Sequence, residues 1–280
     1  MASAFHVYFG PEFGPDAAIQ RPKVRRIEPR DCFAALAEGI DDLLEMPTYP
    51  AFVGLFYGLA GIALVSLTSF GNALHLAFPL AAGFTLVGPF VAVGLYEMSR
   101  RREQGLAATW RDAFAVLRSP ALPSILALGF LLFVIFFAWI EAAQILYVRI
   151  YGPESPATAV SFFRDVLTSG RGWLLTVLGG AIGFCFATVS LCMSVVSFPL
   201  LLDRDVGLVP AISTSLRVSR ENPTAIALWG LIVAAALLLG SLPLFIGLAV
   251  VMPMLGHSTW RLYRRAIERE AARELPVSNG

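Results

Sequence analysis

The chain has 280 residues, of which 57% are hydrophobic and 15% are charged, and its formal net charge is +1. A soluble domain carries about 25% charged residues, so this composition excludes an ordinary soluble protein. Several apolar runs reach the roughly 20 residues that a membrane-spanning helix needs. The near-neutral charge excludes a basic nucleic-acid-binding surface. We therefore expect an all-α integral membrane protein whose surroundings are the lipid bilayer, with no nucleic-acid partner.

Residues 1–30 are rich in proline and in Lys/Arg and contain no apolar core. This pattern predicts an extended tail and excludes a cleaved signal peptide, so that the first membrane helix acts as the targeting signal. A six-span membrane domain is expected over 31–265, followed by a second tail over 266–280. The expected spans are about 51–70, 73–98, 121–148, 173–202, 224–240 and 243–260.

The last two spans come from one apolar block of some 34 residues, which as a single helix would be roughly 50 Å long. Because the hydrocarbon core is only ~30 Å thick, we expect a turn near Gly240–Pro243. Gly71 and Asn72 similarly separate the first two spans into an antiparallel hairpin.

The basic residues predict the orientation of these spans. The first tail, the loop at 99–120 and the C-terminal segment each hold five Lys/Arg, and the loop at 203–222 holds three. The opposite side holds only Arg149, Arg164 and Arg171. By the positive-inside rule, both termini and both basic loops are expected to be cytoplasmic.

Each odd-numbered span is preceded by a short amphipathic segment. Apolar side chains recur at helical spacing in all three segments. They are Phe33, Leu36, Ile40 and Leu43 in the first, Trp110, Phe114 and Leu117 in the second, and Val209, Ile212 and Leu216 in the third. Such helices are expected to lie in the membrane plane, and Val160, Phe163 and Leu167 suggest another on the outer side. They either form a partner surface or, as we favour, seal the cytoplasmic rim of the bundle.

An in-plane helix followed by a helical hairpin thus occurs three times, which predicts a threefold internal repeat. Each even-numbered span carries a proline, at Pro89, Pro199 and Pro253. Helix-interior prolines remove a backbone hydrogen bond and kink the helix.

Polar residues follow these prolines near the cytoplasmic exit. Kinks at similar depth would bring Glu97, Asp203 and His257 into one vestibule. The simpler interpretation is that these three residues lie separately at the water interface.

Two further groups of residues are candidates inside the membrane. Glu141 and Gln144 form a polar pair near the outer end of the third span, where an ionisable group is by default a functional candidate. Alternatively, Glu141 is interfacial and pairs with Arg149. In the fourth span, small residues predict a close helix-packing face, within the chain or between copies. They are Gly179, Gly180, Gly183 and Ala187.

No catalytic or cofactor-binding motif is present in the sequence, which has no HExxH, phosphate loop or GxSxG elbow. The three histidines, His6, His75 and His257, are too scattered for a metal site. Cys185 and Cys192 share a helix face, which favours packing over a metal or redox pair. We expect no cofactor and no metal.

The segment GPFVAVGLYEMSRRRE at 88–103 resembles a signature of an uncharacterised family of bacterial inner-membrane proteins, a family defined by a domain of unknown function. The segment PMLGHSTWRLYRR at 253–265 resembles the family's second signature, and the resemblance spans roughly 25–265. Members of that family often have histidine where this chain has Arg261, which argues against a histidine pair there. The resemblance implies a bacterial inner-membrane location and no established activity.

Three functions remain to be compared. The first is a non-catalytic membrane protein, an accessory or structural subunit or an assembly factor of a membrane complex, which associates with another membrane protein or with itself. The second is a transporter or channel for a small solute or ion that uses the kinked even-numbered helices. An intramembrane enzyme is third, because no nucleophile–base or metal constellation is visible. We favour the first.

Overall fold

The computed structural model describes residues 22–46, 58, 61–62, 92–109, 111–153, 158–243 and 247–269. Most of the expected spans at 51–70 and 73–98, together with Pro89, His75 and most of both tails, lie outside these residues. The described part is all-α, with one isolated antiparallel bridge between Val24 and Ile267. The helices are α2 (Pro29–Glu45), α6 (Val93–Glu103), the 3₁₀ helix η2 (Asp112–Arg118), α7 (Leu122–Tyr151), α8 (Ala159–Thr168), α9 (Gly170–Ser194), α10 (Ser197–Asp203), α11 (Leu208–Glu221), α12 (Pro223–Ser241) and α13 (Leu248–Ala266).

Three of the described helical segments are long and apolar enough to cross a membrane. They are α7, α9 continued by α10, and α12. These segments overlap the spans expected at 121–148, 173–202 and 224–240. The described residues therefore contain three candidate spans, and the remaining expected spans are not placed by them.

The helix at the last expected span, 243–260, lies further along the chain than the apolar pattern suggested. α13 begins at Leu248 and continues to Ala266, with Arg264 and Arg265 in its last turn. Its C-terminal half buries Trp260 and Tyr263. Charged and aromatic side chains extend the helix because each finds a protein partner, as described below.

A two-residue turn at Val195–Val196 divides the segment expected at 173–202 into α9 and α10. The turn lies four residues before Pro199, where the proline ring clashes with the carbonyl of a straight helix. The freed Val196 N–H donates to the Ser215 hydroxyl of α11 at 3.2 Å. By contrast, Pro253 lies inside α13 without interrupting it.

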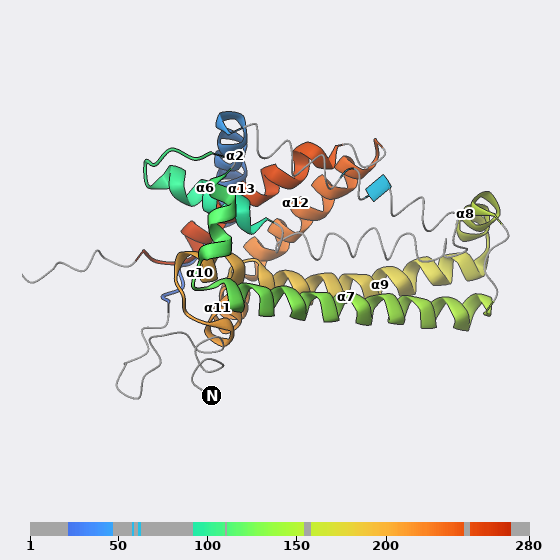
Figure 1. Ribbon diagram of the computed structural model, residues 1–280. Helices are drawn as coiled ribbons and strands as arrows, with labels where there is room; N and C mark the ends of the chain where they lie inside the picture. The colour runs from blue at the N-terminus through green and yellow to red at the C-terminus, as the bar shows by residue number, and fades with distance from the viewer. Residues whose placement is uncertain are drawn as a thin grey trace, which may run out of the picture.

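The described helices form two regions (Figure 1). We call α2, α6, η2, α10, α11 and the C-terminal half of α13 the base. From the base, α7 and α9 run side by side to the short helix α8, and α12 lies on the other side of α9. Most of the buried apolar side chains belong to the base or to the ends of the long helices that enter it.

The contact between α2 and α13 depends on small residues. A Cβ atom at Gly39 would lie 2.0 Å from the Ser258 Oγ and 2.5 Å from its backbone nitrogen, so a side chain there has no room. Cys32 and Ala35 are buried on the same face, whereas Phe33 and Ile40 of the expected apolar face are exposed. Small side chains occupy this face of α2 because they allow the backbones of α2 and α13 to approach closely.

The small residues of α9 divide between two faces. Cβ positions at Gly183 and Gly179 lie 3.4 Å from Trp139 and 3.6 Å from Leu146, so these glycines face α7. Gly180 has nothing within 4 Å of its Cβ position, and Ala187 is exposed. Half of the expected packing face therefore serves contact within the chain.

Candidate functional site

The two segments that carry the family resemblance meet at a buried carboxylate on α2. Asp42 is fully buried. Arg261 of α13 donates two hydrogen bonds to it, from Nε at 2.9 Å and from Nη2 at 2.6 Å. Arg102 of α6 donates from Nη1, and the Ser99 hydroxyl donates at 2.9 Å. Three helices that are distant in the sequence are thereby tied to one carboxylate.

His257 extends this cluster through Ser99. The Ser99 Oγ lies 2.7 Å from the His257 Nδ1. Because the single hydroxyl proton goes to Asp42, the Nδ1 of a neutral imidazole carries the proton and donates to the Ser99 oxygen. The remaining nitrogen, Nε2, is buried and has no hydrogen-bond partner within the part of the chain that the structure describes. We call Asp42, Ser99, Arg102, His257 and Arg261 the Asp42 cluster.

The order of these groups differs from a catalytic triad. In a triad, histidine lies between the carboxylate and the serine and takes the serine proton. Here Ser99 lies between Asp42 and His257, and its hydroxyl donates to the carboxylate. Ser99, Asp42 and His257 are also all fully buried. This arrangement joins helices and does not present a nucleophile.

Other acidic side chains of the base are bound to arginines in the same way. Glu97, only 2% exposed, accepts from Arg100 at 2.7 and 2.9 Å and from Arg101 at 3.0 Å. Glu103 accepts from Arg264 and from the Trp260 indole N–H.

Asp203 and Glu38 continue this pattern. Asp203 accepts from the Tyr263 hydroxyl at 2.6 Å and from Arg264 at 3.0 Å. Glu38 accepts two hydrogen bonds from Arg265, at 3.0 and 2.6 Å. These hydrogen bonds lower the pKa of Glu38, while burial and the nearby Asp203 raise the pKa of Tyr263.

The expected vestibule residues divide between two places. Glu97 and Asp203 line the same open pocket of about 350 Å³, with Arg100, Arg101 and Arg118 among its other walls. His257 belongs to the Asp42 cluster instead. The structure thus brings two of the three residues to one cavity and gives the third a separate set of contacts.

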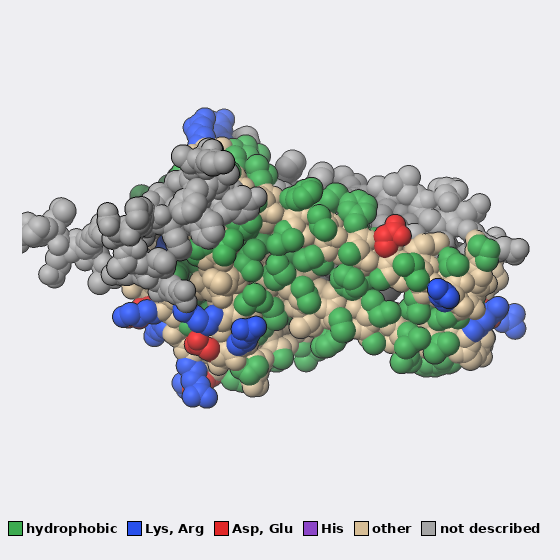
Figure 2. All heavy atoms as spheres, turned by 90° about the horizontal axis from the view of Figure 1, so that it is seen from below, with side chains coloured by type: hydrophobic (Ala, Val, Ile, Leu, Met, Phe, Trp, Pro, Cys, Tyr) green, Lys and Arg blue, Asp and Glu red, His purple; other side chains and the backbone are tan. Residues whose placement is uncertain are grey.

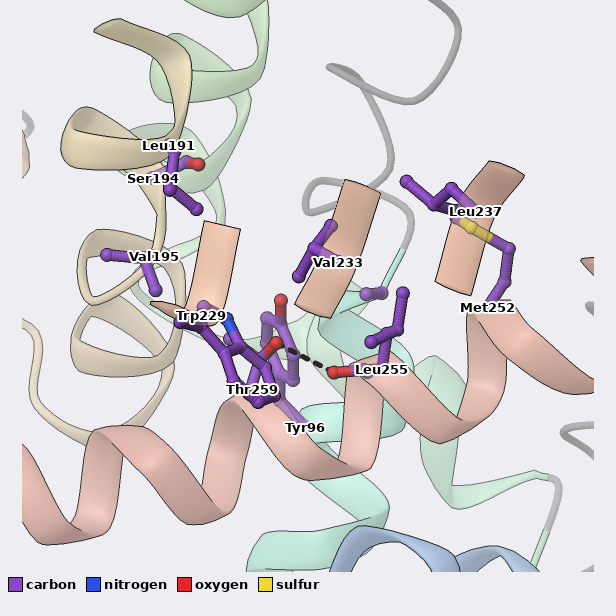
Figure 3. A pocket seen from close by; sticks show the side chains of 12 residues that line it. Tyr96, Leu191, Ser194, Val195, Trp229, Val233, Leu237, Met252, Leu255 and Thr259 are labelled. Atoms are coloured by element: carbon purple, nitrogen blue, oxygen red, sulfur yellow. Dashed lines mark hydrogen bonds between the residues drawn. The ribbon is translucent and has the colours of Figure 1, made fainter. Parts of the chain in front are cut away.

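A second, smaller pocket of about 80 Å³ lies between α6, α9, α12 and α13 (Figure 3). Its walls are mostly apolar, with Trp229 and Leu255 among them. The Thr259 hydroxyl donates to the Leu255 carbonyl at 2.7 Å, so this polar group is already satisfied. Ligand pockets usually have volumes of roughly 300–1,000 Å³, so this space is too small for a typical organic ligand.

The polar pair on α7 lies away from both pockets. Glu141 is exposed and Gln144 is half-buried, and neither lines either cavity. In the described residues, no ion pair joins Glu141 to Arg149, the partner that the sequence suggested. Figure 2 shows that the face of the molecule seen from below is largely hydrophobic, with Lys and Arg gathered toward its two ends.

The described residues form no site for metal binding or for thiol chemistry. Across the described ranges, no group of three or more His, Cys, Asp or Glu side chains is placed to hold a metal ion. Cys32 is buried and its thiol donates to the Ala225 carbonyl, whereas Cys185 is exposed. Cys32 thus has a packing role between α2 and α12.

Sequence reasoning missed the central role of Asp42 and assigned no function to it within the first amphipathic segment. The signal was nevertheless present. Cys32, Ala35 and Gly39 share a helical face with Asp42, and all four are buried. A carboxylate within a stripe of small residues indicates close packing around a charge, and a buried charge requires a compensating cation and hydrogen-bond donors.

The comparisons with known proteins agree with the membrane assignment. A family model described as "Predicted integral membrane protein (DUF2189)" matches residues 77–203. This range includes the first signature at 88–103 and ends before the second at 253–265. No curated protein and no solved structure matches the chain. Over these residues the chain is similar to the DUF2189 family of predicted integral membrane proteins, whose function is unknown.

Proposed function

We propose that this protein is a non-catalytic component of a membrane complex, an accessory or structural subunit or an assembly factor. The observation that carries the proposal is the internal pairing of charge in the base. Asp42, Glu97, Glu103 and Asp203 are each bound to arginines of the same chain. Groups held in this way are positioned to fix helices and not to react. The long helices meanwhile present broad exposed apolar faces.

The proposal includes a topology. We expect six spans in three repeats of in-plane helix and hairpin, in the bacterial inner membrane, with both termini cytoplasmic. The separation of charges along α7 and α9 supports this orientation. The base contains Arg100, Arg204 and Arg261, whereas Arg149 and Arg171 lie near the opposite end, beside α8. The positive-inside rule then assigns the base to the cytoplasm.

Purification from native membranes in mild detergent tests the proposal. A tagged full-length chain should retain one identified polypeptide at a fixed stoichiometry. The reciprocal purification, with the tag on that polypeptide, should recover this chain. A tagged membrane protein of similar size is the control for non-specific capture. A homogeneous species that contains no second polypeptide would contradict the proposal.

A transporter or channel is the second candidate, because Glu97 and Asp203 share one open pocket. The test is proton and sodium flux into proteoliposomes followed with ion-sensitive dyes. This candidate requires a measurable flux that Glu97→Gln and Asp203→Asn both abolish. Glu38→Gln is the matched control, because Glu38 is also paired with arginine but does not line the pocket. Flux that is absent, or equal in all variants, supports the non-catalytic role.

A further inference from the structure

Glu141 lies on an outward face of α7 among apolar side chains. The exposed positions of this helix recur three or four residues apart, so they form one stripe. Exposed side chains of the stripe are Leu126, Phe130, Phe133, Val134, Phe137, Ile145 and Val148. Glu141 follows Phe137 by one turn and precedes Ile145 by one turn, and it is exposed as they are. A carboxylate thus interrupts a face that is otherwise suited to lipid.

The contacts between α7 and α9 give the depth of Glu141. Trp139 packs at Gly183 and Leu146 packs at Gly179. Because the two helices are antiparallel, Glu141 lies level with the segment of α9 between these glycines, near Ala181. Trp173 is eight residues further along α9, which corresponds to about 12 Å. Arg149 is likewise eight residues beyond Glu141 on α7, again about 12 Å.

Helix α8 marks the membrane surface at this end. It crosses the start of α9, where a Cβ atom at Gly172 would lie 2.4 Å from the Val166 Cα. Its opposite face exposes Val160, Phe163 and Leu167. A short amphipathic helix across the end of a bundle is typical of the membrane interface, and an exposed tryptophan such as Trp173 belongs at the same level. Glu141 therefore lies about 12 Å inside this surface.

An ionisable side chain at such a depth is costly and normally pairs with another polar group. Within the described residues, no hydrogen bond or ion pair involves the Glu141 side chain. A second copy of the chain in parallel orientation supplies no Lys or Arg at this depth either. The segments 31–99, 119–148, 172–203 and 221–260 contain no Lys or Arg, and Arg149 and Arg171 lie about 12 and about 15 Å closer to the surface. A parallel copy docked on this stripe would also place one Glu141 opposite another.

We propose that the stripe around Glu141 binds a transmembrane helix of a different membrane protein, and that this helix carries Lys or Arg in the leaflet at the α8 end. The inference rests on the proposed function and deepens it by naming the contact surface and the chemistry of the partner. A cation opposite Glu141 neutralises its carboxylate, and the rings of Phe133 and Phe137, with centroids 4.8 Å apart, border the same contact.

Photo-crosslinking of the full-length chain in native membranes tests the proposal. A photoreactive amino acid replaces Ile145, one turn from Glu141. The matched control places it at Phe184 of α9, which is exposed on a different helix. The Ile145 probe should give one adduct, and the cross-linked peptide should be an apolar segment that contains Lys or Arg. Glu141→Gln should reduce the adduct yield of the Ile145 probe at least tenfold. The same substitution should leave the adduct yield of the Phe184 probe unchanged.

Charge reversal then tests the chemistry directly. Glu141→Lys should abolish the adduct, and changing the identified Lys or Arg of the partner to Glu should restore it. The proposal is overturned by an unchanged yield in Glu141→Gln, by an adduct of twice the mass of this chain, by adducts with lipid alone, or by a cross-linked peptide without a basic residue. If a stoichiometric partner still co-purifies in those cases, only this inference fails. If no partner co-purifies at all, the proposed function fails with it.

Discussion

The base and the long helices differ in how their carboxylates are paired. In the base, Asp42 is fully buried and bound to two arginines and a serine. On the long helix α7, Glu141 is exposed on an apolar face and has no partner among the described residues. The comparison teaches that burial of a charge is not by itself a sign of a functional site. A carboxylate whose partners come from its own chain stabilises the fold, whereas Glu141 lacks such partners among the described residues and is the basis of the proposed contact with another membrane protein.

The largest expected effect is the loss of Asp42. Asp42→Ala leaves Arg102 and Arg261 without their common carboxylate, and breaking a buried ion pair costs roughly 3–5 kcal/mol. Reversible unfolding in mixed micelles measures the free energy of unfolding. Asp41→Ala is the matched control, since Asp41 is adjacent on α2 but exposed, and it should change the stability by less than about 0.5 kcal/mol. Equal losses of unfolding free energy in both variants would show that Asp42 contributes no more to stability than an exposed carboxylate on the same helix.

An intermediate effect is expected where the long helices touch. Trp139 is 5% exposed and packs on Gly183, whereas Phe184 is 73% exposed. Helix association in membranes depends on close packing and not on removal from water. Trp139→Ala should therefore cost about 1–3 kcal/mol, and Phe184→Ala should cost less than about 0.5 kcal/mol. The same unfolding measurement compares them, and a larger loss for Phe184→Ala would show that α9 packs elsewhere.

The smallest effect concerns the pH dependence of the base. Hydrogen bonds from Arg265 lower the pKa of Glu38 in the folded protein. Its contribution to stability is therefore present above the pKa of the unfolded state and is lost as the pH falls through the folded pKa. Glu38→Gln should be less stable than the wild type at pH 7 by under about 1 kcal/mol, because the pair is partly exposed.

The difference in melting temperature between Glu38→Gln and the wild type should disappear as the pH is lowered below the folded pKa of Glu38. A constant or growing difference on acidification would contradict the role of the Arg265 pair. Raising the salt concentration should also narrow the difference at pH 7, since salt screens partly exposed pairs.

Sequence patterns predicted the long helices well and the base less well. Hydropathy alone locates α7, α9 with α10, and α12, because a bilayer selects for length and apolar composition. The break before Pro199 follows from proline chemistry, although Pro253 shows that the same residue can lie within an unbroken helix. These features are local, so a sequence can reveal them.

The Asp42 cluster was not predicted because its members are far apart in the chain. Arg261 and Asp42 are separated by 219 positions, and no local pattern pairs one carboxylate with one arginine among many. The expected grouping of Glu97, Asp203 and His257 rested on similar depth in the membrane. Glu97 and Asp203, which lie at similar depth, line one pocket, but the His257 side chain contacts Ser99 instead. Rotation about a helix axis, which hydropathy does not fix, decides such contacts.

A double-mutant cycle between Asp42 and Arg261 tests most directly whether internal charge pairing holds the base together. Asp42→Ala, Arg261→Ala and the double variant are compared by the free energy of unfolding in the same micelles. Removing both charges leaves fewer uncompensated groups than removing one. The double variant should therefore lose at least about 1 kcal/mol less than the two single losses added together. Additive losses would show that the two side chains do not stabilise the base through each other.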